Sequence, residues 1–106
     1  MMKRTFIIIC TIFLIACDTS QLAIIKLDNK YGCINRKGEI VIKPEWDFIL
    51  QGTESNLLLV EKDSLYGFID KKGNSIIDVK YNDAMIFYEG LAAVGNGEKY
   101  GFINTK

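Results

Sequence analysis

The chain has 106 residues, and its 13 basic and 13 acidic side chains balance to a formal net charge of zero. It contains no histidine, which removes the commonest base of nucleophilic triads and the commonest metal ligand. Balanced charge also gives no basic surface of the kind that binds nucleic acid, so we expect no nucleic-acid partner.

Residues 1–16 are predicted to be a lipoprotein signal peptide. Met1–Arg4 is a basic segment, and Thr5–Ile15 is an apolar run too short to cross a membrane. The run ends in Leu14-Ile15-Ala16-Cys17, which resembles the bacterial lipoprotein lipobox. The resemblance implies cleavage before Cys17 and lipid attachment to the Cys17 thiol. An ordinary signal peptide or an N-terminal anchor helix is the alternative.

Residues 17–20 would then be a short lipidated tether, which holds the domain close to a membrane of the bacterial cell envelope. Loss of Lys3 and Arg4 leaves 11 basic against 13 acidic side chains, so attraction to anionic lipid is weak. The membrane partner is therefore reached through acyl chains on Cys17, because two or more chains anchor stably where one is marginal. Asp18 resembles an inner-membrane retention signal of some Gram-negative bacteria, and the membrane and leaflet stay open.

A Tyr–Gly pattern recurs through the remaining residues, 21–106. The pairs are Tyr31-Gly32, Tyr66-Gly67 and Tyr100-Gly101, at spacings of 35 and 34 residues. Each pair follows an apolar run. A period of this length indicates an array of units that bury their apolar faces on their neighbours. Residues 21–106 are therefore predicted to form one β-repeat domain of about two and a half units.

Each unit is predicted to contain three antiparallel strands, which gives an all-β meander array. In the second unit these are Leu57–Val60, Tyr66–Asp70 and Ser75–Val79. Asn96-Gly97 is the strongest hairpin signal between a first and a second strand. Asp70–Gly73 suits a type I turn in which the Asp side chain bonds the backbone and the glycine has positive φ.

The second strand of each unit is predicted to be central and covered on both faces. Tyr66 and Phe68 point to one face and Ile69 to the other, because strand side chains alternate. Gly67 is expected to admit a close neighbour, often an aromatic ring. Pro44 fits the end of an edge strand. Residues 82–90 suit a helical turn, a loop or a short strand.

The combined pattern resembles the bacterial WG (Trp–Gly) repeat over about residues 21–106. The residues that carry the resemblance are Leu-Ala-Ala-Val at 91–94, Tyr-Gly-Phe-Ile-Asp-Lys-Lys-Gly at 66–73 and Phe-Tyr-Glu-Gly at 87–90. Tyrosine stands in all three units where the family has its eponymous tryptophan. The resemblance implies a β-rich repeat protein with no established catalytic residues.

We accordingly expect no enzyme activity, no cofactor and no metal site. Two carboxylates alone can hydrolyse glycosides, but no pair among the acidic residues stands out. With Cys10 removed and Cys17 lipidated, Cys33 has no disulfide partner. It takes the position of Phe68 and Phe102 in the other units, which predicts a small buried apolar side chain. A reactive or intermolecular thiol is the alternative.

The expected function is non-catalytic binding of an unidentified envelope protein or component. The alternative is a carbohydrate- or peptidoglycan-binding module, in which Trp46, Tyr81 and Tyr88 stack on sugar rings. The same aromatic residues could instead pack unit against unit.

The last predicted strand, Tyr100–Asn104, has an upstream partner in Leu91–Val94 and no downstream partner in this sequence. An unpaired edge invites pairing with another chain. The sequence leaves three explanations open: the edge dimerises, a partner adds a strand, or the chain is a shortened relative of a longer array. The last of these is favoured.

Overall fold

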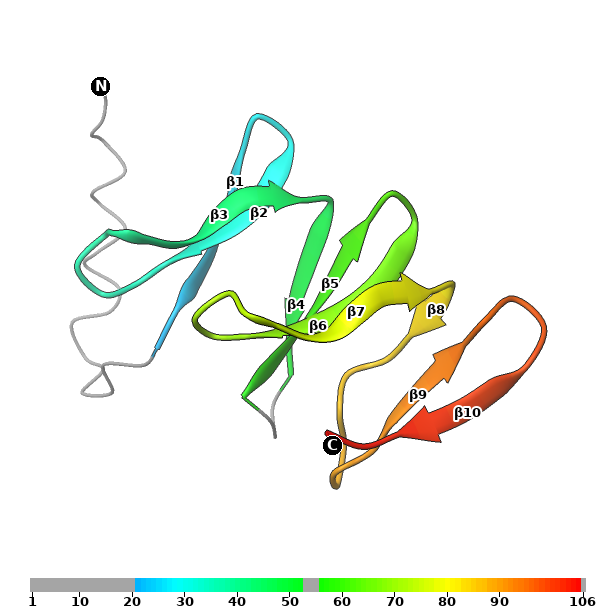
Figure 1. The fold of residues 1–106 in the computed structure, drawn as a ribbon. Coiled ribbons are helices and arrows are strands. Elements are labelled where there is room, and N and C mark those ends of the chain that lie inside the picture. The colour runs from blue at the N-terminus through cyan, green and yellow to red at the C-terminus, as the bar shows by residue number, and fades with distance from the viewer. Residues whose placement is uncertain (1–20, 53–55, 106) are drawn as a thin grey trace.

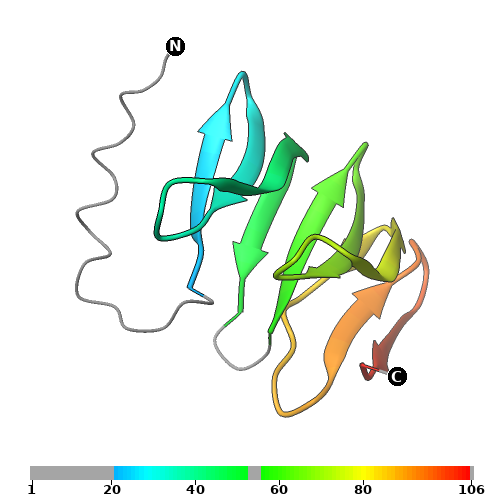
Figure 2. The ribbon, with the colours of Figure 1, turned by 60° about the vertical axis from the view of Figure 1, so that its left-hand side comes forward.

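A computed structural model describes residues 21–52 and 56–105 of the chain. The predicted signal peptide, tether and lipidated Cys17 lie outside these residues. The described residues form ten strands in three antiparallel sheets that follow one another along the molecule (Figures 1 and 2). The predicted all-β fold is confirmed.

The strands fall into sheets of three, four and three members. The first sheet has the order β1-β2-β3, the second β4-β5-β6-β7 and the third β10-β9-β8. Their bounds are β1 Ala23–Leu27, β2 Lys30–Ile34, β3 Ile40–Trp46, β4 Phe48–Gln51, β5 Leu57–Lys62, β6 Leu65–Asp70, β7 Ser75–Tyr81, β8 Asp83–Ala84, β9 Ala92–Gly95 and β10 Tyr100–Ile103.

The predicted three-stranded meander is present as β1-β2-β3 and as β5-β6-β7. The structure adds a fourth strand that carries the chain into the next sheet. β4 pairs with β5, and β8 pairs with β9. A single residue, Asp47 or Asn82, separates each of these strands from the one before it. The backbone N–H of Asp47 donates to the carbonyl oxygen of Glu61 at 2.8 Å, and that of Asn82 donates to the carbonyl oxygen of Gly95 at 2.9 Å.

Two kinds of turn join the strands within a unit. Asp28 and Asn29 both have positive φ, of 50° and 66°, which is the geometry of a two-residue type I′ hairpin. In the third unit the turn residues are Gly97 and Glu98, one position later than the Asn-Gly pair predicted. Gly97 has a φ of 103°, and the Asn96 side chain accepts from the N–H groups of Glu98 and Lys99.

The predicted turn at Asp70–Gly73 is confirmed. Gly73 has a φ of 94°, and the Asp70 carboxylate accepts hydrogen bonds from the N–H groups of Lys72 (2.9 Å) and Asn74 (2.8 Å). Asn35 holds the equivalent turn of the first unit in the same way. A polar side chain that accepts two backbone N–H groups therefore fixes the second turn in both units.

The central strand β6 is buried on both faces, as predicted. Phe68 and Ile69 are both buried and pack in different apolar clusters. The neighbour that approaches Gly67 is not an aromatic ring. A Cβ added there would lie 2.6 Å from the carbonyl oxygen of Ile77 and 2.8 Å from the backbone of Asp78. Residues 78–80 of β7 lie between the partners of Tyr66 and Phe68 and arch over the glycine, so only hydrogen fits.

Pro44 and residues 82–90 also differ in detail from the prediction. Pro44 lies inside β3, on the irregular stretch opposite Gly32, and not at the strand's end. β3 is nevertheless an edge strand of its sheet. Residues 82–90 contain the short strand β8 and then a loop closed by a bridge between Tyr88 and Leu91, with no helical turn.

Candidate interaction surface

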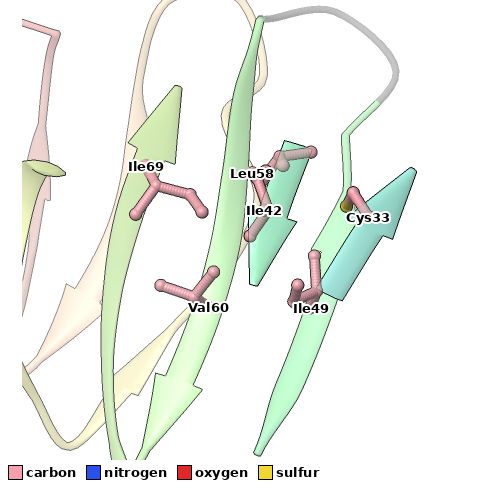
Figure 3. Packing of buried hydrophobic residues seen from close by; sticks show 6 residues of the cluster. All are labelled: Cys33, Ile42, Ile49, Leu58, Val60 and Ile69. Atoms are coloured by element: carbon pink, nitrogen blue, oxygen red, sulfur yellow. The ribbon is translucent and has the colours of Figure 1, made fainter. Parts of the chain in front are cut away.

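Two apolar clusters join the three sheets, and we name them the first and second interface clusters. The first lies between the first and second sheets, and Figure 3 shows its six buried side chains. The second lies on the opposite face of β5 and β6, against the third sheet. The first cluster contains Cys33, Ile42, Ile49, Leu58, Val60 and Ile69. The second contains Leu59, Phe68, Phe87 and Ala92, with Ile77 and Ile103 packed against it.

The second cluster repeats the first one unit further along the chain. Phe68 takes the position of Cys33, and Ile77 that of Ile42. Ile103 packs in the second cluster as Ile69 packs in the first. The central strand β6 therefore gives Ile69 to the interface with the first sheet and Phe68 to the interface with the third sheet.

The third unit breaks this pattern at its outer face. Cys33 is 0% exposed and Phe68 is 1% exposed, but the equivalent Phe102 is 73% exposed. Tyr100 is 74% exposed, whereas the equivalent Tyr31 and Tyr66 are half-buried. Tyr100 and Phe102 lie on one face of β10 and Ile103 on the other, which is the alternation predicted for Tyr66, Phe68 and Ile69.

The glycines of the three Tyr–Gly pairs also differ: those of the first two units are covered, and that of the third unit is open. A Cβ added at Gly32 would lie 2.4 Å from the carbonyl oxygen of Ile42, and Gly67 is covered equally closely by β7. A Cβ added at Gly101 meets nothing within 4 Å. β10 is the outer strand of its sheet, and no strand in residues 21–52 and 56–105 pairs with its far edge. We call Tyr100, Gly101 and Phe102 the outer face of β10.

Tyr100 is held in place although its ring is exposed. Its hydroxyl donates a hydrogen bond to the Asp83 carboxylate at 3.2 Å. The ring lies across Gly95, its antiparallel partner in β9, where an added Cβ would come within 2.6 Å of a ring carbon. The outer face therefore has a defined shape, and its aromatic ring is preorganised for contact.

Of the three residues predicted to stack on sugars, Trp46 and Tyr81 occupy equivalent positions in their units, and Tyr88 does not. Trp46 and Tyr81 end β3 and β7, opposite Tyr31 and Tyr66 in the adjacent strands. Both are half-buried. The ammonium groups of Lys62 and Lys80 lie over their rings, at 5.6 and 5.5 Å from the ring centroids.

Tyr88 lies elsewhere, in the loop between β8 and β9. It is 64% exposed, and its backbone bonds to Leu91 in both directions. Trp46 and Tyr81 thus recur with the repeat, and Tyr88 does not.

Cys33 is fully buried in the first interface cluster, as predicted, and burial raises the pKa of its thiol to about 11. Such a thiol is protonated at neutral pH and a poor nucleophile.

Within the described ranges, no three or more His, Cys, Asp or Glu side chains are placed to hold a metal ion. The same residues include no helix with the length and apolar character needed to span a membrane.

Asp47 connects two units, a role that no local sequence pattern predicts. Its carboxylate forms an ion pair with Lys30 of β2 and accepts a hydrogen bond from the Asp63 N–H at 2.9 Å. These bonds to Lys30 and Asp63 hold the pKa of Asp47 below its usual value. Asp47 aligns with Asn82 in the repeat, and the Asn82 side chain lies beside Gly97, the equivalent of Asp63. This alignment is the signal that could have indicated that both side chains contact a hairpin turn of the next unit.

Two consecutive stretches of the chain match the model of one known protein family. That family is described as WG containing repeat, and the matches cover residues 31–66 and 66–100. The chain belongs to the WG repeat family. No curated protein and no solved structure matches it.

The WG repeat boundaries explain why the sheets and the repeats are out of step. The first matched WG repeat contains most of β2 and all of β3 and β4, and reaches β6 after β5. Each WG repeat therefore starts in one sheet and ends in the next. The second matched repeat ends at Tyr100, the first residue of β10, and Tyr100 and Gly101 begin the same pattern again.

Proposed function

We propose that this WG repeat protein is a lipid-anchored module of the bacterial cell envelope that binds an envelope protein or component without catalysis. The observation that carries the binding role is the outer face of β10. Phe102 is 73% exposed at a position where the other two units bury their side chain completely or almost completely. An exposed aromatic pair on a fixed scaffold suits recognition of a partner, since aromatic residues supply much of the energy of protein interfaces.

The anchoring role is supported by residues 1–17. A basic start, an apolar run and the sequence Leu14-Ile15-Ala16-Cys17 agree with a lipobox. In this proposal Cys17 carries the acyl chains, and Tyr–Gly pairs stand in place of the family's Trp–Gly pairs. A module fixed to a membrane through its N-terminal end keeps its binding partner at that membrane.

Lipidation is tested by partition of the full chain in Triton X-114. Wild-type protein should enter the detergent phase, and Cys17→Ser should leave an unprocessed precursor or a water-soluble product. Cys33→Ser serves as the matched control, because it removes a thiol without touching the lipobox. Normal processing and detergent partition of Cys17→Ser would refute lipid attachment at that residue.

Binding is tested by cross-linking the anchored chain in detergent-solubilised envelope. Wild-type protein and Tyr88→Ser should capture the same partner, and Phe102→Asp should lose it. Tyr88 is a suitable control because it is an exposed aromatic residue, like Tyr100 and Phe102, but lies outside the outer face of β10. Equal capture by Phe102→Asp would exclude this face as the binding surface.

A second candidate is glycan binding through Trp46 and Tyr81. It is favoured by their recurrence at equivalent strand ends, one repeat apart. Lysine ammonium groups already lie over both rings, so a sugar has to displace them or use the opposite ring faces. Because Trp46 is the only tryptophan, a glycan panel that leaves its fluorescence unchanged in the folded chain would reject this candidate.

A further inference from the structure

The two complete units show what covers a Tyr–Gly strand. In the first unit β3 runs antiparallel to β2, with Tyr31 opposite Trp46 and Cys33 opposite Ile42. In the second, β7 pairs with β6 through Tyr66 opposite Tyr81 and Phe68 opposite Ile77. In both, an apolar residue and an aromatic residue four positions later bracket a stretch that arches over the glycine.

β10 presents the same three groups in the same order. Tyr100 and Phe102 flank Gly101, and the space over the glycine is open to at least 4 Å. The other edge of β10 is already paired with β9, which fixes the strand in an extended conformation. A docking strand therefore finds a formed template and does not have to order it, which lowers the entropic cost of binding.

We propose that the C-terminal unit binds an extended segment of a second polypeptide as a strand added to the outer edge of β10. The segment runs antiparallel to β10, in the register of β3 on β2 and of β7 on β6. It places an apolar residue opposite Phe102 and an aromatic residue, four positions later, opposite Tyr100. Main-chain hydrogen bonds give affinity and these two side chains give specificity.

A second copy of this chain does not provide such a segment. Its two strands with the pattern, β3 and β7, are edge strands, but their apolar pattern residues, Ile42 and Ile77, are already packed in the two interface clusters and cannot also cover Phe102 of another copy. Neither β1 nor β10 contains an apolar residue followed four positions later by an aromatic one. The occupant is therefore a partner polypeptide that carries the pattern.

The partner segment also needs an aromatic cover for Phe102. In the second interface cluster the ring of Phe87 packs edge-on against Phe68, with ring centroids 4.8 Å apart and an interplanar angle of 67°. Phe87 comes from the loop that follows β7 and β8. A partner segment that continues for several residues beyond its paired strand can place an aromatic ring on Phe102 in the same way.

The inference is tested with a fluorescein-labelled synthetic peptide that has the sequence of residues 73–88. This peptide contains the strand pattern and the Phe87 cover. Binding to the full chain in detergent is followed by fluorescence anisotropy. The matched control peptide carries Ile77→Asp and should bind about tenfold more weakly or worse, because it puts a carboxylate on Phe102. Amide exchange of Tyr100–Ile103 should slow when the first peptide binds.

Gly101→Ala provides a variant of the protein that keeps its fold. A methyl group at Gly101 meets no neighbouring atom in the free chain, but it would occupy the space that a docked strand needs, as at Gly32 and Gly67. We expect an unchanged unfolding temperature or a slightly higher one, and peptide binding weakened about tenfold or more. Equal peptide binding by Gly101→Ala, or no binding by the wild-type chain, would overturn the inference.

The inference rests on the proposed binding role of the outer face and not on lipid anchoring, and the two fail separately. If the peptide does not bind but partner capture remains sensitive to Phe102→Asp, the binding role stands and strand addition is wrong. Sedimentation separates the remaining case. A dimer that Phe102→Asp dissociates, together with no peptide binding, would mean that β10 pairs with its own copy, and that also overturns the inference.

Discussion

The Asp47 carboxylate accepts a hydrogen bond from the backbone N–H of Asp63 at 2.9 Å, across the junction between two units. Asp63 is the first residue of the β5–β6 hairpin turn and has a φ of 53°. The same carboxylate pairs with Lys30 at the start of β2. One exposed side chain therefore ties a hairpin turn of the second unit to the first unit.

We expect Asp47→Ala to lower the unfolding temperature more than Asp47→Asn does. Alanine removes both contacts, whereas asparagine keeps one oxygen that can accept from the Asp63 N–H and loses the ion pair with Lys30. The chain supports this substitution, because Asn82 holds the equivalent position. Thermal unfolding followed by circular dichroism measures the difference, with the exposed Glu45→Gln as control. Equal losses for both variants would show that the Asp63 bond contributes nothing.

Acid should destabilise the fold through Asp47 and Asp70. Hydrogen bonds from Lys30 and the Asp63 N–H lower the pKa of Asp47, and hydrogen bonds from Asn74 lower the pKa of Asp70. A carboxyl group with a lower pKa in the folded state stabilises fully above its ordinary value of 3.8. That contribution is lost as pH falls through the folded-state values. The unfolding temperature should therefore be flat near neutral pH and decrease below about pH 4.

Asp70→Asn tests whether the acid response comes from the charge of the carboxylate, because asparagine can keep the hydrogen bonds of the turn. Asn35 makes the same two backbone contacts in the first unit, so asparagine should retain the turn at neutral pH. The variant should lose less stability than wild type between pH 5 and pH 3. A wild-type acid response in the double variant Asp47→Asn, Asp70→Asn would contradict the assignment.

Phe68→Ala and Phe102→Ala should differ sharply, although the residues are equivalent in the repeat. Phe68 is buried in the second interface cluster, so its truncation should cost about 3–5 kcal/mol of unfolding free energy. Phe102 is exposed, so its truncation should change stability by no more than about 0.5 kcal/mol. Urea unfolding of the two variants measures both values. A large loss for Phe102→Ala would mean that the outer face is covered within the chain.

The Cys33 thiol should react slowly while the protein is folded. It is fully buried, and burial raises its pKa to about 11, so both access and thiolate fraction are low at pH 8. Labelling is measured in a chain with Cys10→Ser and Cys17→Ser, in which Cys33 is the remaining cysteine. We expect rapid reaction only after denaturation. Fast labelling of the native chain would instead support a reactive thiol.

Most of the repeat architecture could be predicted from the sequence because its signals are local. The Tyr–Gly spacing gives the unit, alternation gives the two buried faces of β6, and Asp70 and Gly73 give the turn. The outer face of β10 follows from the same alignment, since Phe102 stands where Phe68 does.

The crossing strands β4 and β8 could not be predicted because their partners lie in the next unit. The sequence of Phe48–Gln51 is too short to predict a strand by itself, and the segment is extended because it pairs with β5. The sequence predicts an aromatic ring over Gly67 and misses the true neighbour for a related reason. The group that covers it is the backbone of an irregular stretch in β7, and a backbone arch leaves no distinctive residue in the sequence.

The pairing of β4 with β5 also determines how the array responds to bending. A rotation of the first sheet against the second has to break hydrogen bonds between β4 and β5 or open the first interface cluster. Pairing of β8 with β9 and the second cluster impose the same restraint at the next junction. Rotation between neighbouring sheets is therefore restrained at both junctions, and the outer face of β10 lies at one end of a body that is 45 Å in its longest dimension (Figure 1).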